Sequence, residues 1–378
     1  MLVNDIDMAG VEFTGIGTSD KPFTGIFDGK GHTIFNITRS LGDNKRGGLF
    51  DITSGAVIKN LGVSNVSIIS KSGQDIGGIV GHATNTTVDQ CYVLGYIEGN
   101  DHVGGIFGGC KTSYINNSFV NASVITNGYQ AGGLSGVASG LEITNSYAAG
   151  EVISNNTSWP GRAAGIIGMT ESSGSSMIGV ASMSNIAGGI IGHFLGTADG
   201  FDRQLAAFEK CIYSTEASYT PGEGNEADNT SCYELCTKVE DNGNDWNTVP
   251  RVSATDGRTE ADLVKWDTYA AIGWDSEVWT MPEDGGYPVL KNVELKKEAG
   301  IESVVANEEG ASVNVYGTYG AIVVEAEGEA IVNVYNFSGM FLGQFNVAGS
   351  TTLEFAPALY IVNVKSAAGV KTAKVLVR

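Results

Sequence analysis

The sequence of 378 residues predicts an all-β protein, in which a parallel β-helix with about three strands per coil is followed by a small C-terminal β-sandwich. Three observations predict the β-helix. A glycine pair followed by an apolar residue returns at near-regular intervals, an alternating apolar strand follows each copy, and the repeats show no helical spacing over a useful length. Internal repeats of 20–50 residues are typical of solenoids and propellers.

The glycine repeat is clearest as "DIGGIVG" at 75–81, "HVGGIFG" at 102–108 and "QAGGLSG" at 130–136. The glycine before the apolar residue recurs in steps of 30, 27, 28, 32 and 24 residues, at Gly48, Gly78, Gly105, Gly133, Gly165 and Gly189. A missing side chain lets the backbone turn sharply or lets an opposing wall come close. We therefore expect these glycines to stack, with an internal apolar ladder beside them that consists of Ile79, Ile106, Leu134, Ile166 and Ile190.

Each glycine copy is followed by a second signal, in which an aromatic residue precedes an alternating apolar strand. Tyr92, Phe119 and Tyr147 occupy this place, and we expect an aromatic ladder next to the apolar one. Three strands of about five residues and their turns use some 28 residues, which closes one coil, and coils would stack about 4.8 Å apart. A propeller is the alternative, but its blades need about four strands in 40 or more residues.

Composition and charge narrow the function classes. The net charge is −20 and no basic stripe occurs, which argues against binding of nucleic acid. No run of 18 apolar residues could span a membrane. Charged residues make up only 17%, which suits an extracellular surface. The opening "MLVNDIDMAG" reads as the interior of a domain, so we expect a secreted or cell-surface protein whose export signal is missing from this sequence.

The first 150 residues resemble the GLUG-repeat surface proteins of bacteria. The resemblance rests on "KPFTGIFDGKGHTIFNIT" at 21–38 and on "GGLFDITSGAVIKNLGVSNV" at 47–66, which lead into the glycine-pair repeats. It covers residues 4 to about 150, then loosely to about 215, and "WDSEVWTMPEDGGYPVLK" at 274–291 looks like the usual end of such a module. The resemblance implies a parallel β-helix in surface proteins, adhesins and accessory regions of large proteases, and does not itself imply catalysis.

The repeat fades after the β-helix of residues 1–200, and residues 201–297 read as an irregular, partly helical end of the module. An uncapped solenoid exposes unpaired strand edges, so we expect this segment to cap the stack. Its aromatic residues would fill the core of the cap or, alternatively, form a sugar-binding platform; they are Trp266, Trp274, Trp279 and Tyr287. In "EDNGNDW" at 240–246, Asp241 and Asp245 could hold calcium, with a solvated turn as the alternative.

Residues 298–378 form a run of short strands with turns every 8–12 residues, which predicts the small β-sandwich. The alternation of Val332 and Val334, and of Leu359 and Ile361, indicates one buried face. "VYNFSG" at 334–339 and "LYIVNV" at 359–364 resemble the C-terminal sorting domains of secreted Bacteroidetes proteins. An ordinary appended sandwich is the alternative.

Catalytic motifs are absent from the sequence. It contains no Gly-x-Ser-x-Gly, no His-Glu-x-x-His and no Walker loop, and the four histidines fit turn or packing positions. We therefore predict a protein that is not an enzyme and needs no cofactor, calcium aside. Its predicted role is adhesion, through the solenoid flank, to glycans or to host or matrix proteins. The alternatives are a polysaccharide lyase or hydrolase on a β-helix and a purely structural stalk; the oligomeric state stays open.

Overall fold

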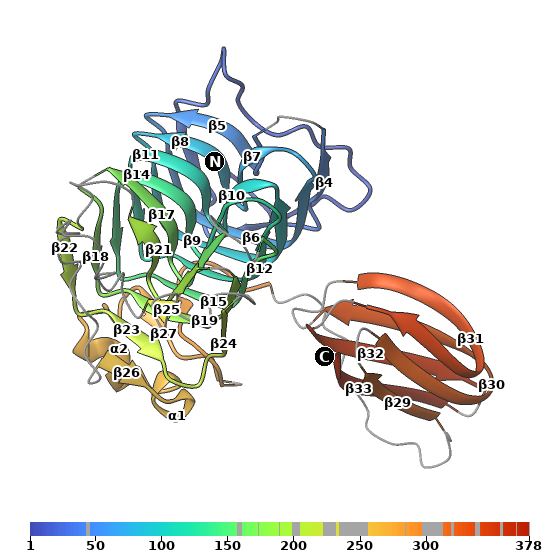
Figure 1. Ribbon diagram of the computed structural model, residues 1–378. Helices are drawn as coiled ribbons and strands as arrows, with labels where there is room; N and C mark the ends of the chain where they lie inside the picture. The colour runs from blue at the N-terminus through green and yellow to red at the C-terminus, as the bar shows by residue number, and fades with distance from the viewer. Residues whose placement is uncertain are drawn as a thin grey trace. The chain divides into compact units, whose positions relative to one another are not determined.

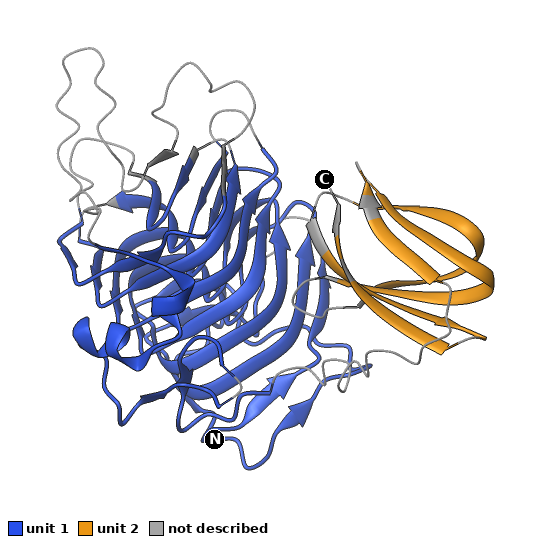
Figure 2. Ribbon diagram, turned by 90° about the horizontal axis from the view of Figure 1, so that it is seen from below, with its two compact units in different colours: residues 1–296 blue, residues 297–378 orange. Residues whose placement is uncertain are grey.

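The structure of the chain is a computed structural model, and it divides into two compact units, residues 1–296 and 297–378 (Figures 1 and 2). Each unit is described by itself. The structure describes the whole chain except residues 43–45, 157–160, 173, 189, 199–204, 222–231, 234–255, 284, 297–312, 319–320, 337–340, 356–357, 368 and 378.

The first unit is the predicted parallel β-helix, which is thereby confirmed. Six successive coils each give one strand to a parallel six-stranded sheet, made of β7 (Gln74–Gly77), β10 (Asp101–Gly104), β13 (Gln130–Gly132), β16 (Arg162–Ala164), β20 (Ile190–Gly192) and β25 (Cys232–Tyr233). Figure 1 shows the successive coils lying side by side in chain order.

The remaining strands of the solenoid join in one sheet of twenty strands, paired in parallel from coil to coil. The first coil supplies β1 (Ile6–Asp7), β2 (Ile26–Asp28), β3 (Thr33–Phe35) and β4 (Thr38–Leu41). The next three coils supply β5 (Phe50–Ser54), β6 (Val57–Ser70), β8 (Val80–Thr84), β9 (Thr87–Gly99), β11 (Phe107–Asn116) and β12 (Phe119–Thr126). The later coils supply β14 (Ser135–Thr144), β15 (Tyr147–Ser154), β17 (Ile167–Ser172), β18 (Ser176–Ile178), β19 (Ala181–Gly188), β21 (Leu195–Ala198), β22 (Ala207–Glu209), β23 (Ile212–Ser214), β24 (Tyr219–Pro221) and β26 (Gly257–Arg258).

The glycine repeat places one apolar side chain per coil inside the stack. The backbone N–H of Ile79 donates to the carbonyl of Ile106, that of Ile106 to Leu134 at 2.9 Å, and that of Leu134 to Ile166 at 2.9 Å. All four side chains are fully buried. The ladder therefore forms from Ile79 to Ile166, and Leu49 extends it into the first coil.

The stacked glycines are needed because the coils approach each other too closely for a side chain. A β-carbon on Gly78 would lie 2.4 Å from the carbonyl oxygen of Gly105, and one on Gly133 would lie 2.0 Å from that of Gly165. Real β-carbons essentially never come within 3.0 Å of such a neighbouring atom. The glycine column is thus a steric requirement of the stack rather than a source of flexibility.

In the last repeat the register differs from our prediction. Ile190 pairs with Arg162 in the six-stranded sheet. The residue that stacks on Ile166 in the next coil is Phe194, and its carbonyl accepts a hydrogen bond from the Ile167 N–H at 2.8 Å. Phe194 is fully buried, and Gly189 lies outside the described residues. The sequence "AGGIIGHF" at 187–194 offers two frames, and the strand pairing selects the second one.

The aromatic ladder forms, but on the outer face of the sheet. Phe119 stacks on Tyr92 with ring centroids 5.3 Å apart and on Tyr147 at 4.9 Å. These rings belong to a second apolar cluster with Trp274 and Trp279, separate from the core inside the coils. Both faces of the sheet are therefore buried here, which the alternation of residues alone could not reveal.

The segment that covers the aromatic ladder is residues 259–296, which we call the strap. It contains α1 (Glu260–Leu263), α2 (Trp266–Ala271), β27 (Trp279–Thr280) and β28 (Val289–Leu290). Near its start, Glu260 Oε1 accepts a hydrogen bond from Ser214 Oγ at 3.0 Å, the indole N–H of Trp274 donates to Gly179 O at 2.7 Å, and near its end the Glu294 N–H donates to Gly31 O at 3.0 Å. The strap thus runs from the later coils back along the flank to the first coil. Residues 222–231 and 234–255 of the predicted cap lie outside the described residues.

The second unit is one curled antiparallel sheet, so the predicted all-β character holds to the C-terminus (Figure 1). Its strands are β29 (Val313–Thr318), β30 (Ala321–Asn336), β31 (Phe341–Glu354), β32 (Ala358–Ser366) and β33 (Gly369–Val377). Val332 and Val334 are buried as predicted. In β32 the buried face carries Val362 and Val364, the opposite parity from the predicted Leu359 and Ile361.

A buried histidine should make the solenoid sensitive to mild acid. The His193 ring packs 4.1 Å from the Tyr213 ring and is 6% exposed, and burial lowers its pKa to about 3. Because this folded-state pKa lies below the unfolded value of about 6.5, its contribution to stability is present above that value and is lost as pH falls toward about 3.

We therefore expect the free energy of unfolding to fall by about 2 kcal/mol from this group between pH 6.5 and 5. Urea unfolding across that range measures the slope. The variant His193→Gln should flatten it. An unaltered slope in His193→Gln would refute the assignment.

Candidate functional site

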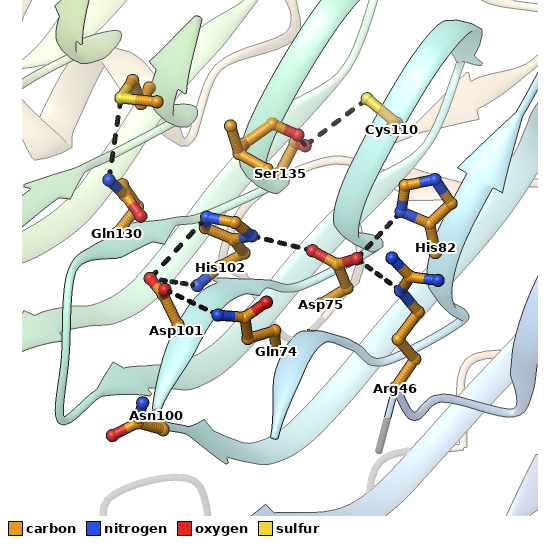
Figure 3. A network of polar contacts seen from close by, with 12 residues as sticks. Arg46, Gln74, Asp75, His82, Asn100, Asp101, His102, Cys110, Gln130 and Ser135 are labelled. Atoms are coloured by element: carbon orange, nitrogen blue, oxygen red, sulfur yellow. Dashed lines mark hydrogen bonds and ion pairs between the residues drawn. The ribbon is translucent and has the colours of Figure 1, made fainter. Parts of the chain in front are cut away.

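A column of polar side chains lies at one corner of the solenoid, just before each glycine pair. We call it the corner column; with one residue from each of five successive coils, it consists of Arg46, Asp75, His102, Gln130 and Arg162. Three of them, Asp75, Gln130 and Arg162, are buried, with exposed fractions of 5% for Asp75 and 2% for Arg162. Figure 3 shows its central members with their neighbours.

The corner is tight because of the third glycine in each repeat. A β-carbon on Gly108 would lie 2.2 Å from the backbone of Asp75 and Ile76, and one on Gly136 would lie 2.4 Å from the backbone nitrogen of Val103. The strand after each glycine motif therefore packs directly against the backbone at the corner of the preceding coil. This contact brings His82, on β8, next to Asp75 on β7.

Asp75 is the hub of the corner column. Its Oδ2 accepts from Arg46 Nε at 2.7 Å and contacts His82 Nδ1 at 2.9 Å, while its Oδ1 contacts His102 Nδ1 at 2.8 Å (Figure 3). The Asp75 side chain is 7% exposed, whereas those of Arg46 and His82 are 43% and 31% exposed. A buried carboxylate thus holds a guanidinium and an imidazole that reach solvent.

The electrostatics of the hub keep Asp75 ionised. Burial alone would raise the pKa of Asp75, but the hydrogen bonds from His102 and His82 outweigh it and hold the pKa well below its ordinary value. Burial alone would lower the pKa of His102, yet the hydrogen bond to Asp75 and the charge of Asp101 raise it. Burial raises the pKa of Asp101, and the charge of Asp75 adds to this effect. Asp75 and His102 therefore each favour the charged form of the other.

The column continues through the next coils. With its amide oriented to satisfy both neighbours, Gln130 donates to Asp101 Oδ1 at 2.9 Å and accepts from Arg162 Nη1 at 3.0 Å. Arg162 Nη1 also lies 3.1 Å from the sulfur of Met169. The polar network thus spans four coils from Asp75 to Arg162, and its end near Arg46 and His82 reaches solvent.

The corner can bind a charged group or transfer a proton. Asp75 and His82 have the carboxylate–imidazole geometry that orients a general base. Among the described residues, no hydroxyl or thiol lies within hydrogen-bond distance of His82. Cys110 and Ser135 contact each other at 3.7 Å, but burial raises the pKa of the Cys110 thiol to about 12, which removes its thiolate at neutral pH.

The aromatic residues predicted for a cap or a sugar platform lie in the strap. Trp279 is 1% and Trp274 4% exposed, because both pack against the aromatic ladder. Trp266 and Tyr287 are half-buried, and the Tyr287 hydroxyl donates to Glu260 at 2.8 Å. The strap therefore buries the two tryptophans that a sugar platform would have to present.

The predicted calcium ligands Asp241 and Asp245 lie outside the described residues. Within the described part of the chain, no group of three or more His, Cys, Asp or Glu side chains is arranged to hold a metal ion. The described helices include none of the length and apolarity that crossing a membrane requires.

The sequence analysis gave His82 and His102 turn or packing positions and missed Asp75. The signal was present, because "DIGG" at 75–78 and "DHVGG" at 101–105 place acidic residues beside the repeat glycines.

The chain is similar in sequence to short segments of much longer proteins. The chain is 31% identical over 163 residues to an immunoglobulin A1 protease of Streptococcus pneumoniae, which covers 41% of the chain and 8% of that protein. It is 29% identical over 152 residues to that of Streptococcus sanguinis, and 37% identical over 92 residues to a halomucin of Haloquadratum walsbyi, of which it covers 1%. The chain thus spans less than a tenth of the length of these relatives.

A solved structure shares the fold. It is a protein of Bacteroides ovatus to which the name immunoglobulin A1 protease has been assigned provisionally, and it matches 77% of this chain and 85% of its own with a TM-score of 0.57 and 24% identity. No family model matches the chain, so the resemblance to GLUG-repeat proteins rests on the quoted motifs alone.

These comparisons correct one prediction. From the missing motifs we expected a protein that is not an enzyme, but the curated streptococcal relatives and the solved structure carry the name of a protease. Motif absence in this chain was a poor guide, because the relatives are more than ten times longer than the matched segment. The exclusion of an enzyme is therefore wrong.

Proposed function

We propose that this chain is the β-helical part of a secreted or surface protein of the immunoglobulin A1 protease type, and that its solenoid flank binds the protein on which the larger molecule acts. The names of the streptococcal relatives support the assignment to the immunoglobulin A1 protease type. The chain matches under a tenth of the length of these relatives, which supports the proposal that it corresponds to one part of such a protein. Solenoids present extended flanks on which a large partner can be held.

The observation that carries the proposal is the solvent-reaching end of the corner column. Arg46, His82 and His102 gather nitrogen groups around one buried carboxylate in a chain whose net charge is −20. Charged groups fixed by a buried partner cost less entropy to engage than mobile surface side chains do. A rigid, charged corner on a repeating flank suits recognition of a macromolecule.

Adhesion to a glycan or a matrix protein is the second candidate. The similarity to 92 residues of a halomucin favours it, because the same kind of repeat then occurs in a protein that is not named as a protease. In this case the flank would attach the protein to a surface rather than hold a substrate.

Binding of the purified chain to immobilised immunoglobulin A1, with immunoglobulin G as control, tests the first candidate by surface plasmon resonance. We expect saturable, selective binding of immunoglobulin A1 in the micromolar range typical of a weak recognition module. A gel of the same mixture reports cleavage, which would place the reaction in this chain itself. Absence of binding to immunoglobulin A1, with hits on a glycan or matrix-protein array instead, would replace the first candidate by the second.

A further inference from the structure

We propose that Arg46 and His82, held side by side by Asp75, form a binding site for a carboxylate group. The carboxylate would come from an acidic sugar or from an acidic side chain of the partner. For its biological partner the inference rests on the proposed function; the site itself is argued from the corner alone.

The two side chains are pre-organised through one oxygen atom. Arg46 Nε and His82 Nδ1 both approach Asp75 Oδ2, at 2.7 and 2.9 Å. Each side chain therefore uses one nitrogen on Asp75 and directs its others away from it, as Figure 3 shows. Among the described residues, neither the Arg46 Nη atoms nor His82 Nε2 has a hydrogen-bond partner.

These free donors match a carboxylate in geometry. The Nη edge of a guanidinium offers two parallel N–H groups that bind both oxygens of a carboxylate, and charge-assisted bonds of this kind are the strong ones. The neighbouring imidazole adds a third donor in its protonated form: Nδ1 faces the Asp75 carboxylate, so Nε2 carries an N–H only when both ring nitrogens are protonated. The buried Asp75 behind them fixes the orientation of both side chains, so little rotamer freedom is lost on binding.

The local charge favours an anion although the whole chain is acidic. Asp75 is neutralised by the cations that it holds, and Asp101 faces His102 at 3.7 Å on the side away from Arg46 and His82. Salt screens the more distant acidic residues, because the Debye length is about 8 Å at physiological ionic strength. The donors at the corner therefore decide what binds there.

A matched control lies on the same face of the solenoid. Lys111 is exposed, and it follows Gly109, the residue that pairs with His82, by two positions along β11. Its ammonium group has no ion-pair partner among the described residues. Lys111→Gln removes one positive charge near the site without disturbing Asp75, as Arg46→Gln does within the site.

The test uses N-acetylneuraminate and an acetylated glutamate peptide as probes, with the methyl ester of the sugar and the corresponding glutamine peptide as uncharged references. Side-chain N–H signals of Arg46 and the ring signals of His82 are followed by NMR in the full chain. We expect saturable shifts with millimolar affinity for at least one acid and none for the references. Arg46→Gln and His82→Gln should weaken binding about tenfold or more, as the loss of a charge-assisted hydrogen bond implies, and Lys111→Gln by less than about twofold.

Equal weakening by Lys111→Gln and Arg46→Gln would overturn the proposal, since it would indicate unspecific attraction, and so would the absence of saturable shifts in the folded wild-type chain. Circular dichroism confirms that each variant is folded. The outcomes separate from those of the proposed function: carboxylate binding without immunoglobulin A1 binding leaves the site standing and removes that partner. Binding of immunoglobulin A1 that Arg46→Gln does not alter, without carboxylate shifts, removes the site alone.

Discussion

Gly133→Ala is expected to lower the free energy of unfolding of the solenoid by about 3 kcal/mol or more. Its new β-carbon would lie 2.0 Å from the carbonyl oxygen of Gly165 and 2.6 Å from the β-carbon of Ala148. Both atoms belong to the fixed framework of the stack, so neither coil can give way without breaking backbone pairing, and overpacking of this kind is costly. Urea unfolding followed by circular dichroism measures the loss.

Gly42→Ala is the matched control, because a β-carbon there meets nothing within 4 Å and the residue has no positive φ. We expect that variant to change stability by less than about 0.5 kcal/mol. Equal stability of the two alanine variants would show that the coils are not packed as closely as the glycine column requires.

Trp279→Ala is expected to cost about 3–5 kcal/mol and to loosen the strap. The Trp279 side chain is 1% exposed and its ring lies 4.4 Å from that of Trp274 and 6.1 Å from those of Phe119 and Tyr147. Truncation opens a large cavity between the strap and the aromatic ladder, and limited proteolysis should then cut the strap earlier than in the wild type.

Two further variants make the effect of Trp279 specific. Trp279→Phe keeps most of the ring contact and removes an indole N–H that is buried without a partner among the described residues, so it should retain much of the lost stability. Tyr129→Ala, at a residue that is 44% exposed, should change little. A strap that is cut no faster in Trp279→Ala than in Tyr129→Ala would contradict its anchoring role.

Much of the fold could be predicted because the glycine repeat marks positions where the coils approach too closely for a side chain. Gly78, Gly105 and Gly133 each lie under the carbonyl of the next coil, so a single residue type marks the same place three times. The same logic could have corrected the last coil. The step from Gly165 to His193 is 28 residues, in line with the earlier steps, whereas the predicted Gly189 required a step of 24.

Other features could not be predicted, because they depend on chain segments that meet only in the fold. The aromatic residues looked internal since nothing in the sequence shows that a strap more than 100 residues later covers the outer face. The hub at Asp75 joins Arg46, His82 and His102 from three coils, and its members are 7 to 29 residues from Asp75. In β32 apolar residues occupy both odd and even positions, so the sequence does not show which of the two faces of the strand is buried.

The corner column, the glycine column and the aromatic ladder all require coils that stack residue over residue. Nitroxide labels at cysteines replacing Thr84 and Lys111, which pair in register, test this directly against labels at Thr84 and Ser139, which lie two coils apart. The labelled chain has serine in place of Cys232 and Cys236. Burial raises the pKa of Cys91 and raises those of Cys110 and Cys211 to about 12, which keeps these three native thiols unreactive. Stacking in this register predicts strong dipolar broadening of the electron paramagnetic resonance spectrum for the first pair, about 4.8 Å apart, and clearly weaker broadening for the second, about twice as far. Equal broadening of both pairs, or none in the first, would contradict the stack.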